Sequence, residues 1–129
     1  MEGLLKLPVI RGFDASSQAI EIAIDNASGI GLEDHIEFSQ RAIKDCAPAP
    51  EGQPGLVVVN PPYGERLGEV DELKPLYIEL GDCLQAQYLG WRASVITNDA
   101  ELGKCLGIRA RHITQLYNGA LECILLRLE

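Results

Sequence analysis

The chain has 129 residues, 47% of them hydrophobic and 23% charged, with a formal net charge of −8. This is enough for one ordinary globular domain, and no apolar run approaches the roughly 20 residues of a membrane-spanning helix, so we expect no membrane partner. The acidic balance argues against binding of a polyanion through the chain's own charge, because Lys and Arg contacts to phosphates supply most of the affinity of nucleic-acid binders.

The four cysteines, Cys46, Cys83, Cys105 and Cys123, are widely spread along the chain. No Cys-x-x-Cys pair occurs, and no Cys and His stand at the spacing of a metal site. We therefore expect no metal and no disulfide, and each cysteine is predicted to be a small buried hydrophobe. No secretion signal is present, which predicts a cytoplasmic location.

The N-terminal part of the chain predicts a strand, a helix and a second strand. The first strand is Val9–Phe13, and Asp14 follows it directly. A helix is predicted to begin at residues 15–17, directly after Asp14. It carries apolar residues at helical spacing and ends near Gly29. His35–Ser39 alternates between apolar and polar residues, which is typical of a short strand.

Asp14 has two interpretations at this position. An acidic residue at the tip of the second strand of a doubly wound fold can accept hydrogen bonds from both ribose hydroxyls of a nucleoside cofactor. Asp is also a favoured N-cap for the helix that follows. Position alone leaves both roles open.

The centre of the chain combines a Pro/Gly-rich connector with a short apolar strand. Residues 47–55 are predicted to be a loop between elements and not a domain boundary. Val57–Val59 is a run of β-branched residues, which predicts a central parallel strand buried on both faces. Pro61 and Pro62 have no backbone N–H and stop the strand, and Asn60 is held extended before them. This places a stiff loop at the carboxyl end of the strand, where open α/β sheets bind their ligands.

The loop after this strand suits one chemical task. The Asn60 side chain and a proline-flanked carbonyl can both accept hydrogen bonds from an exocyclic –NH2 group, and the Tyr63 ring can stack on a planar base. Catalysis would then be mostly positioning of an amine toward an electrophile, without a strong base. The alternative is an ordinary strand-to-loop turn, since Asn-Pro and Pro-Pro mark turns in many proteins.

The C-terminal part predicts a helix, a strand, a small helix and a hairpin. Pro75 is placed in the first turn of the long helix, where proline is tolerated, and the dipeptide 118–119, Asn-Gly, is a strong signal for a tight turn. In chain order the predicted elements are the helix Glu72–Gln87, the strand Ala93–Thr97, a small helix capped by Asn98-Asp99, and the hairpin strands His112–Tyr117 and Leu121–Leu128.

Two stretches of the sequence resemble a known family. Asn60-Pro61-Pro62-Tyr63 resembles the motif of S-adenosylmethionine (SAM)-dependent amino methyltransferases, which methylate exocyclic nitrogens of adenine, cytosine, guanine or glutamine. The longer stretch through Gly64-Glu65-Arg66-Leu67, together with Gly12-Phe13-Asp14 upstream, is similar to the ribosomal RNA guanine-N2 methyltransferases of the large-subunit K/L type. The likeness runs over most of the chain.

The resemblance implies a cofactor and a set of site residues. SAM is the implied methyl donor. The implied catalytic residues are Asn60, Pro61, Pro62 and Tyr63. Asn60 also belongs to the cofactor side, and the resemblance favours the ribose role for Asp14. Asp45 matches an acidic position after the third strand that accepts a bond from the adenine amino group, with a solvated turn residue as the alternative.

The implied fold is α/β, a partial Rossmann-like SAM-methyltransferase fold with a mostly parallel sheet and a C-terminal antiparallel hairpin. The first strand and the glycine-rich loop of that fold have no counterpart, because the pair Gly29 and Gly31 follows a helix instead of a strand. Residues 1–129 are therefore expected to be the C-terminal portion of a methyltransferase domain, inactive alone, with ribosomal RNA as partner through an N-terminal module that is missing.

A missing first strand would leave a gap in the middle of the sheet. Either the strand before Asn60 pairs directly with Val9–Phe13, or two chains exchange strands and form a homodimer. Two other functions stay open, namely a non-catalytic α/β interaction module and a DNA or protein-glutamine amino methyltransferase. Glu65 and Arg66 are expected to form a surface pair, or alternatively Arg66 contacts a phosphate.

Overall fold

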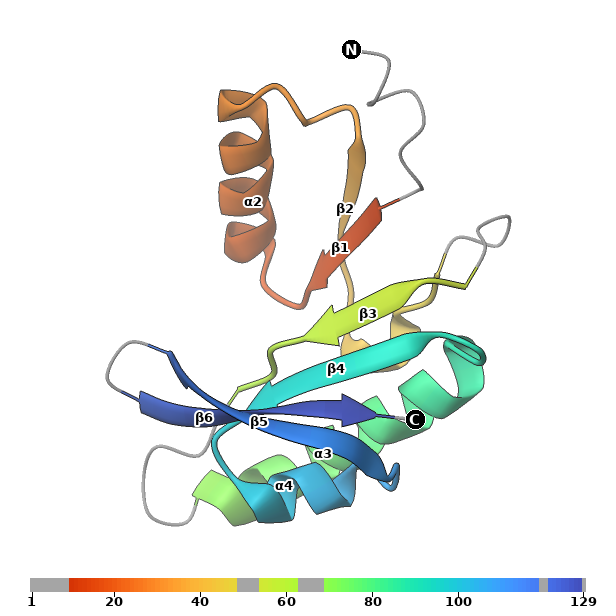
Figure 1. Ribbon diagram of the computed structural model, residues 1–129. Helices are drawn as coiled ribbons and strands as arrows, with labels where there is room; N and C mark the ends of the chain where they lie inside the picture. Colours follow the sequence, from red (N-terminus) through yellow and green to blue (C-terminus); the bar gives the residue numbers. More distant parts are fainter. Residues whose placement is uncertain (1–9, 49–53, 63–68, 119–120, 129) are drawn as a thin grey trace. The chain divides into compact units, whose positions relative to one another are not determined.

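The structure is a computed structural model that describes residues 10–48, 54–62, 69–118 and 121–128 (Figure 1). The chain divides into two compact units, Met1–Gln53 and Pro54–Glu129. The division falls in the Pro/Gly-rich connector, which the sequence predicts to be a loop inside one domain. Part of that connector, residues 49–53, lies outside the described residues.

The first unit is a β-α-β arrangement, the unit that a parallel strand pair requires. Its elements are β1 (Ile10–Asp14), α2 (Ser17–Gly29), β2 (Ile36–Gln40) and the short 3-10 helix η1 (Ile43–Asp45). The two strands are parallel, and their register runs from Ile10 opposite Ile36 to Asp14 opposite Gln40. The strand-helix-strand order predicted from the sequence is confirmed.

Local capping explains where α2 begins and ends. The Ser16 hydroxyl accepts a hydrogen bond from the Ala19 N–H at 3.2 Å, so Ser16 is the N-cap. At the other end, Gly31 has a φ of 75°, and the Leu32 N–H donates to the Ala27 carbonyl at 2.8 Å. A left-handed glycine that lets the chain fold back onto the last turn is a common helix ending.

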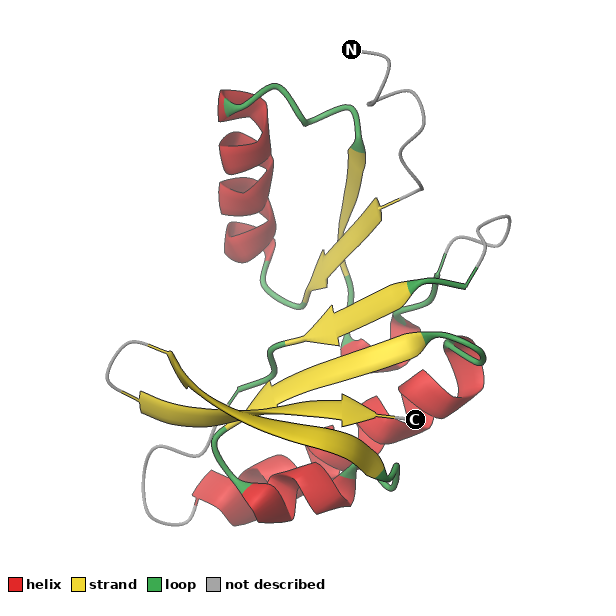
Figure 2. Ribbon diagram, in the orientation of Figure 1, coloured by secondary structure: helices red, strands yellow, loops and turns green. Residues whose placement is uncertain are grey.

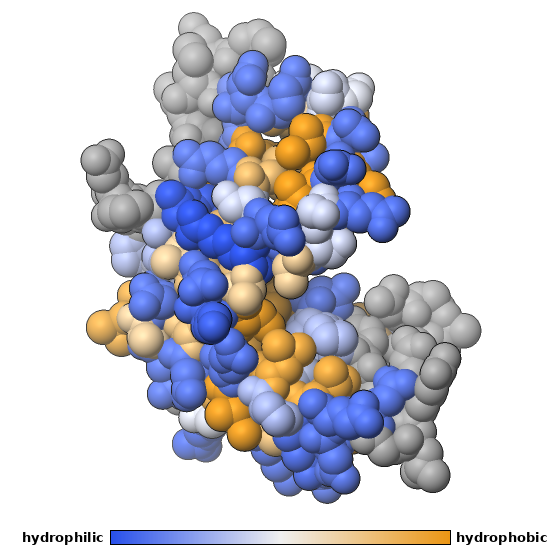
Figure 3. All heavy atoms as spheres, turned by 180° about the vertical axis from the view of Figure 1, so that it is seen from behind, coloured by the Kyte–Doolittle hydropathy of each residue, from blue (hydrophilic) through white to orange (hydrophobic). Residues whose placement is uncertain are grey.

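The first unit has little core of its own. Among its described residues, Ala27 is the only one that is fully buried, and Ile22 and Ile24 of α2 are 54% and 41% exposed. Figure 3 shows apolar side chains on the surface of this unit. One strand pair and one helix bury too little apolar surface to offset the chain entropy lost on folding.

The second unit is a four-stranded mixed sheet with two helices (Figure 2). Its elements are β3 (Leu56–Val59), α3 (Glu69–Gln87), β4 (Arg92–Thr97), α4 (Ala100–Cys105), β5 (Ala110–Asn118) and β6 (Leu121–Leu128). The strand order is β3-β4-β6-β5, with β3 and β4 parallel and both β4-β6 and β5-β6 antiparallel. The predicted C-terminal hairpin is confirmed, and it extends a parallel strand pair.

The hydrophobic core lies between this sheet and its two helices, which cover the same face. Alternate residues of β4 point into it, so Ala93, Val95 and Thr97 are buried while the residues between them are partly exposed. The largest completely buried side chains are Tyr77, Leu102, Leu106, Val95, Thr97 and Cys123. They come from both helices and two strands, so one core holds the unit together.

Two details of the second unit differ from expectation. β3 is not buried on both faces, because Leu56 and Val58 are 59% and 58% exposed; the face that they occupy is not the face covered by α3 and α4. α3 begins at Glu69, three residues before the prediction, since acidic residues in its first turn favour the helix dipole. Pro75 therefore lies inside the helix, where it cannot donate to the carbonyl of Asp71.

β1 and β3 belong to different units, and direct pairing between them, one of the two alternatives that the sequence left open, stays a prediction. Between described residues, β1 pairs only with β2, and β3 pairs only with β4. Each of these two strands therefore has one edge whose N–H and C=O groups take part in no described ladder. Unpaired strand edges are places where other chains bind.

None of the four cysteines, all of them among the described residues, is in a disulfide, as predicted. Cys83 and Cys123 are buried like small hydrophobes, whereas Cys46 and Cys105 are only half-buried. Burial raises the pKa of the Cys46 thiol, the Arg41 guanidinium lowers it, and the Asp45 carboxylate raises it, with burial the largest effect.

The two helices of the second unit touch through a glycine. A Cβ on Gly81 of α3 would come within 1.8 Å of the carbonyl oxygen of Leu106, the C-cap of α4. Backbone cannot give way as a flexible side chain can. Only glycine allows the two helices to approach this closely.

We expect Gly81→Ala to destabilise the second unit by about 3 kcal/mol, because overpacking forces the two helices apart. Urea unfolding followed by the fluorescence of Trp91, the only tryptophan, reports on this unit. Gly29→Ala at the end of α2 is the control, since a Cβ there meets nothing within 4 Å. An unchanged Trp91 transition in Gly81→Ala would contradict the contact.

Candidate active site

The candidate amine site lies where two parallel strands end at the same edge of the sheet. Val59, the last residue of β3, is opposite Val95 of β4, which continues to Thr97, so both strands run toward the same edge of the sheet. Asn60 is exposed, and Pro61 behind it is buried. The carboxyl edge of parallel strands is the usual ligand position in open α/β sheets.

Hydrogen bonds from the core hold this corner. The Tyr77 hydroxyl of α3 donates to the Pro62 carbonyl oxygen at 2.9 Å, and the Tyr77 oxygen lies 3.0 Å from Oγ1 of Thr97 at the end of β4. The Asp99 N–H donates to Thr97 Oγ1 at 3.4 Å. The sequence predicted the helix and the strand that carry Tyr77 and Thr97 but no contact between them, and their hydroxyl groups were the only signal of this contact.

Asp99 has a further structural role, as the N-cap of α4. Its Oδ1 accepts hydrogen bonds from the N–H groups of Glu101 at 2.7 Å and Leu102 at 3.2 Å. The predicted cap at residues 98–99 is confirmed for Asp99. The remaining predicted residue of the site, Tyr63, lies outside the described residues, as do Glu65 and Arg66.

Asp14 is the last residue of β1, and its carboxylate Oδ1 accepts a hydrogen bond from the Ser16 N–H at 2.8 Å. The cap of α2 is Ser16, so the alternative interpretation of Asp14 as the N-cap is wrong. The Arg41 N–H donates to the Asp14 carbonyl at 2.9 Å, and the Gln40 side chain donates to the Ala15 carbonyl at 3.0 Å. These bonds hold the loop after β1 against the end of β2, and sequence reasoning did not foresee them.

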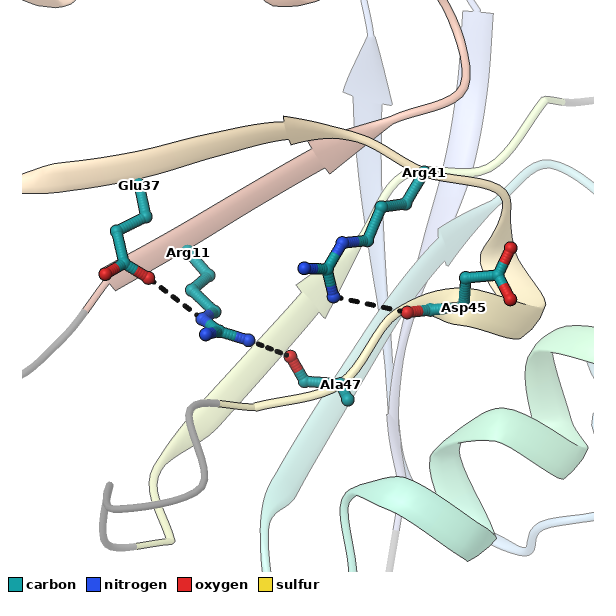
Figure 4. Close-up of polar contacts among 5 residues, drawn as sticks. All are labelled: Arg11, Glu37, Arg41, Asp45 and Ala47. Atoms are coloured by element: carbon teal, nitrogen blue, oxygen red, sulfur yellow. Dashed lines mark hydrogen bonds and ion pairs between the residues drawn. The ribbon is translucent and has the colours of Figure 1, made fainter.

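Asp45 lies at the end of η1, just past the carboxyl end of β2, and is exposed. Arg41 Nη1 donates to its main-chain carbonyl at 3.4 Å, while the Asp45 carboxylate points away from Arg41 (Figure 4). The Arg41 guanidinium also lies 4.9 Å from the centre of the Phe13 ring, a cation–π contact. Asp14 and Asp45 thus follow neighbouring parallel strands at the same edge.

A second arginine ties the connector to β1. Arg11 Nε donates to the Glu37 carboxylate at 3.0 Å, and Arg11 Nη1 donates to the Ala47 carbonyl at 3.2 Å (Figure 4). Both arginines of this unit therefore make internal contacts. Within the described residues no group of three or more His, Cys, Asp or Glu side chains could hold a metal ion, and no helix is long and apolar enough to span a membrane.

The strand order, with parallel pairs and a C-terminal antiparallel hairpin, defines a Rossmann-like fold of the SAM-dependent methyltransferase type. The profile of the RMKL-like methyltransferase domain family matches residues 2–127. The chain belongs to this family.

Curated relatives agree with this assignment. The chain is 47% identical over 129 residues to the ribosomal RNA large subunit methyltransferase K/L of Syntrophotalea carbinolica, covering 98% of this chain and 18% of that protein. It is 49% identical over 121 residues to the protein of the same name from Methylococcus capsulatus, covering 94% of this chain and 16% of that protein. The chain thus spans less than a fifth of the length of either relative.

Solved structures show the same fold. SMU.472, crystallised with S-adenosylhomocysteine (SAH), superposes with a TM-score of 0.82 at 34% identity, covering 92% of this chain and 30% of that one. A protein of Clostridium difficile 630 described as a possible methylase also gives a TM-score of 0.82, at 32% identity, covering 93% of this chain and 31% of that one.

Proposed function

We propose that this chain is the C-terminal part of the catalytic domain of a SAM-dependent N-methyltransferase, and that its target is guanine N2 of large-subunit ribosomal RNA. The observation that carries the proposal is the proline-stiffened corner after β3, with Asn60 exposed and Pro61 buried behind it. The names of the curated relatives support an RNA substrate. The neighbour crystallised with SAH supports SAM as methyl donor.

Each residue of the corner has a defined part in this proposal. The Pro62 carbonyl accepts from Tyr77. The Asn60 side-chain oxygen and the carbonyl of Pro61 are the proposed acceptors for the substrate amine. Two such bonds aim the nitrogen lone pair, and catalysis is positioning without a strong base. SAM supplies the methyl group when it is bound. Tyr63 is proposed to stack on the base.

Contacts to the cofactor are proposed for two carboxylates of the first unit. The carboxylates of Asp14 and Asp45 are exposed past the ends of β1 and β2. Carboxylate oxygens suit the hydroxyl and amino donors of an adenosine group, Asp14 toward the ribose and Asp45 toward the adenine. The methionine part requires a glycine-rich turn that this sequence does not contain, so we propose that the chain alone is inactive.

The net charge of −8 assigns RNA binding to another part of the protein. Contacts to several phosphates require clustered Lys and Arg residues. We propose that an N-terminal module supplies them and that the protein acts in the cytoplasm, where ribosomal RNA of a bacterium is made.

A second candidate function is a non-catalytic α/β interaction module. The acidic balance and the missing glycine-rich turn favour it. A DNA or protein-glutamine methyltransferase is a third, because Asn60-Pro61-Pro62-Tyr63 does not by itself specify which amine it holds.

We expect the chain alone to bind SAH in the millimolar range or not at all in calorimetric titration. A longer polypeptide that supplies the glycine-rich segment should bind at least about 100-fold more tightly. In that polypeptide Asp14→Asn should weaken binding about 10-fold, through loss of charge-assisted hydrogen bonds. Asp25→Asn on the exposed side of α2 is the matched control. Tight binding by the chain alone would contradict the cofactor assignment.

We expect Asn60→Ala to lower kcat for methyl transfer by roughly 10²- to 10³-fold, the usual cost of removing one preorganised hydrogen-bonding group from an active site. The assay uses the longer polypeptide, tritiated SAM and ribosomal RNA. Asn26→Ala, at an exposed position of α2, is the matched control. Unchanged methyl transfer in Asn60→Ala would remove the catalytic role proposed for this chain.

The open edges of β1 and β3 support a homodimer formed by strand exchange when the chain is alone. We expect sedimentation in dilute buffer to show dimers, and Val58→Lys to shift them toward monomer, because a charge on an edge strand opposes pairing. Ile78→Lys, at a 49% exposed position of α3, should leave the dimer intact. A monodisperse monomer of the unaltered chain would rule the dimer out.

A further inference from the structure

Four groups form a continuous line from the start of α4 to the corner after β3. They are the Asp99 N–H, the hydroxyls of Thr97 and Tyr77, and the Pro62 carbonyl, with successive distances of 3.4, 3.0 and 2.9 Å. Tyr77 and Thr97 are both 0% exposed. Buried polar groups in a core are expensive unless they are hydrogen-bonded, so this line needs an explanation.

The direction of every bond follows from chemistry. A carbonyl oxygen can only accept and a tyrosine hydroxyl has one proton, so Tyr77 donates to Pro62. In the contact between Tyr77 and Thr97 the donor must then be Thr97. The Thr97 oxygen in turn accepts from the Asp99 N–H. Aligned hydrogen bonds of this kind polarise and strengthen one another inside a protein.

The line ends on the one loop that carries the proposed amine site. The ring of each proline already fixes its φ angle. The ladder between β3 and β4 holds the loop at Val59, and Tyr77 holds it at the Pro62 carbonyl, three residues further on. The segment of Asn60 and Pro61 is therefore fixed at both ends by the packed core.

We propose that Tyr77 and Thr97 are positioning residues of the amine site, Tyr77 by direct contact with the loop and Thr97 by orienting the Tyr77 hydroxyl. The inference rests on the proposed function. Neither residue touches the substrate. Tyr77 holds the Pro62 carbonyl toward the core and so fixes the backbone next to Asn60 and Pro61, which carry the proposed acceptors for the amine.

A merely structural role would predict something different. If the two hydroxyls only satisfied each other in the core, removing both would restore stability and activity together, because neither buried hydroxyl would remain without its partner. If Tyr77 positions the loop, removing both would restore stability only. The double variant Tyr77→Phe with Thr97→Val separates the two roles, since both changes nearly conserve shape.

The test compares these variants in the longer polypeptide that transfers methyl groups. We expect Tyr77→Phe to lower kcat by about 10- to 100-fold, the effect of a displacement of about 1 Å at a reacting group, with the KM for SAM unchanged. The double variant should recover thermal stability but keep the low kcat. Thr97→Val alone should lower kcat by less than Tyr77→Phe, because the bond to Pro62 remains. Tyr117→Phe, on a 66% exposed side chain of β5, is the matched control.

Three outcomes would overturn the inference, and they show whether the proposed function fails with it. Normal kcat in Tyr77→Phe beside a low kcat in Asn60→Ala removes the positioning role and leaves the proposed function intact. Recovery of both stability and kcat in the double variant has the same meaning. Normal kcat in Asn60→Ala removes the proposed function itself, and with it the site that Tyr77 would position.

Discussion

The parallel ladder between β3 and β4 is the constraint on which the candidate site depends. It makes both strands run toward one edge of the sheet, with Asn60 directly after β3 and Thr97 as the last residue of β4, its side chain buried in the core. α3 crosses the same face and brings the Tyr77 hydroxyl between them. The close contact of Gly81 with the end of α4 fixes the distance between α3 and α4. Packing of the core thus sets the geometry of a loop that has no regular structure of its own.

Much of this arrangement could be predicted from the sequence, because its signals are local. Valine runs, the Asn-Gly turn and the cap at Asp99 each predicted an element that the structure contains. The interactions that hold the site could not be predicted, because they join residues far apart in the chain. Nothing local distinguishes Tyr77 from the other apolar positions of α3, and its partners are 15 and 20 residues away. The early start of α3 was missed because Pro75 suggested a first turn.

The two units differ in how their free energy of folding is provided. The second has a core between its sheet and two helices, whereas the first buries only Ala27 completely among its described residues. Exposed isoleucines on α2 and the exposed Leu56 and Val58 on β3 represent apolar surface that would contribute roughly 25 cal/mol per Å² if it were covered. The open edges of β1 and β3 would contribute backbone hydrogen bonds in addition. The free energy of folding of the first unit therefore depends on whatever covers its exposed apolar surface and pairs its open strand edge.

The charged side chains of this chain are also poorly suited to binding RNA. The arginines that lie near the cofactor edge are engaged internally, Arg11 with Glu37 and Ala47, and Arg41 with Phe13 and the Asp45 carbonyl. They stiffen the loops after β1 and β2 and are poorly placed to neutralise phosphates as well. An excess of eight negative charges would repel a polyanion over the Debye length of about 8 to 10 Å at physiological salt. If RNA is the substrate, affinity must come from other segments, and the proposed contribution of this chain is to orient one amine.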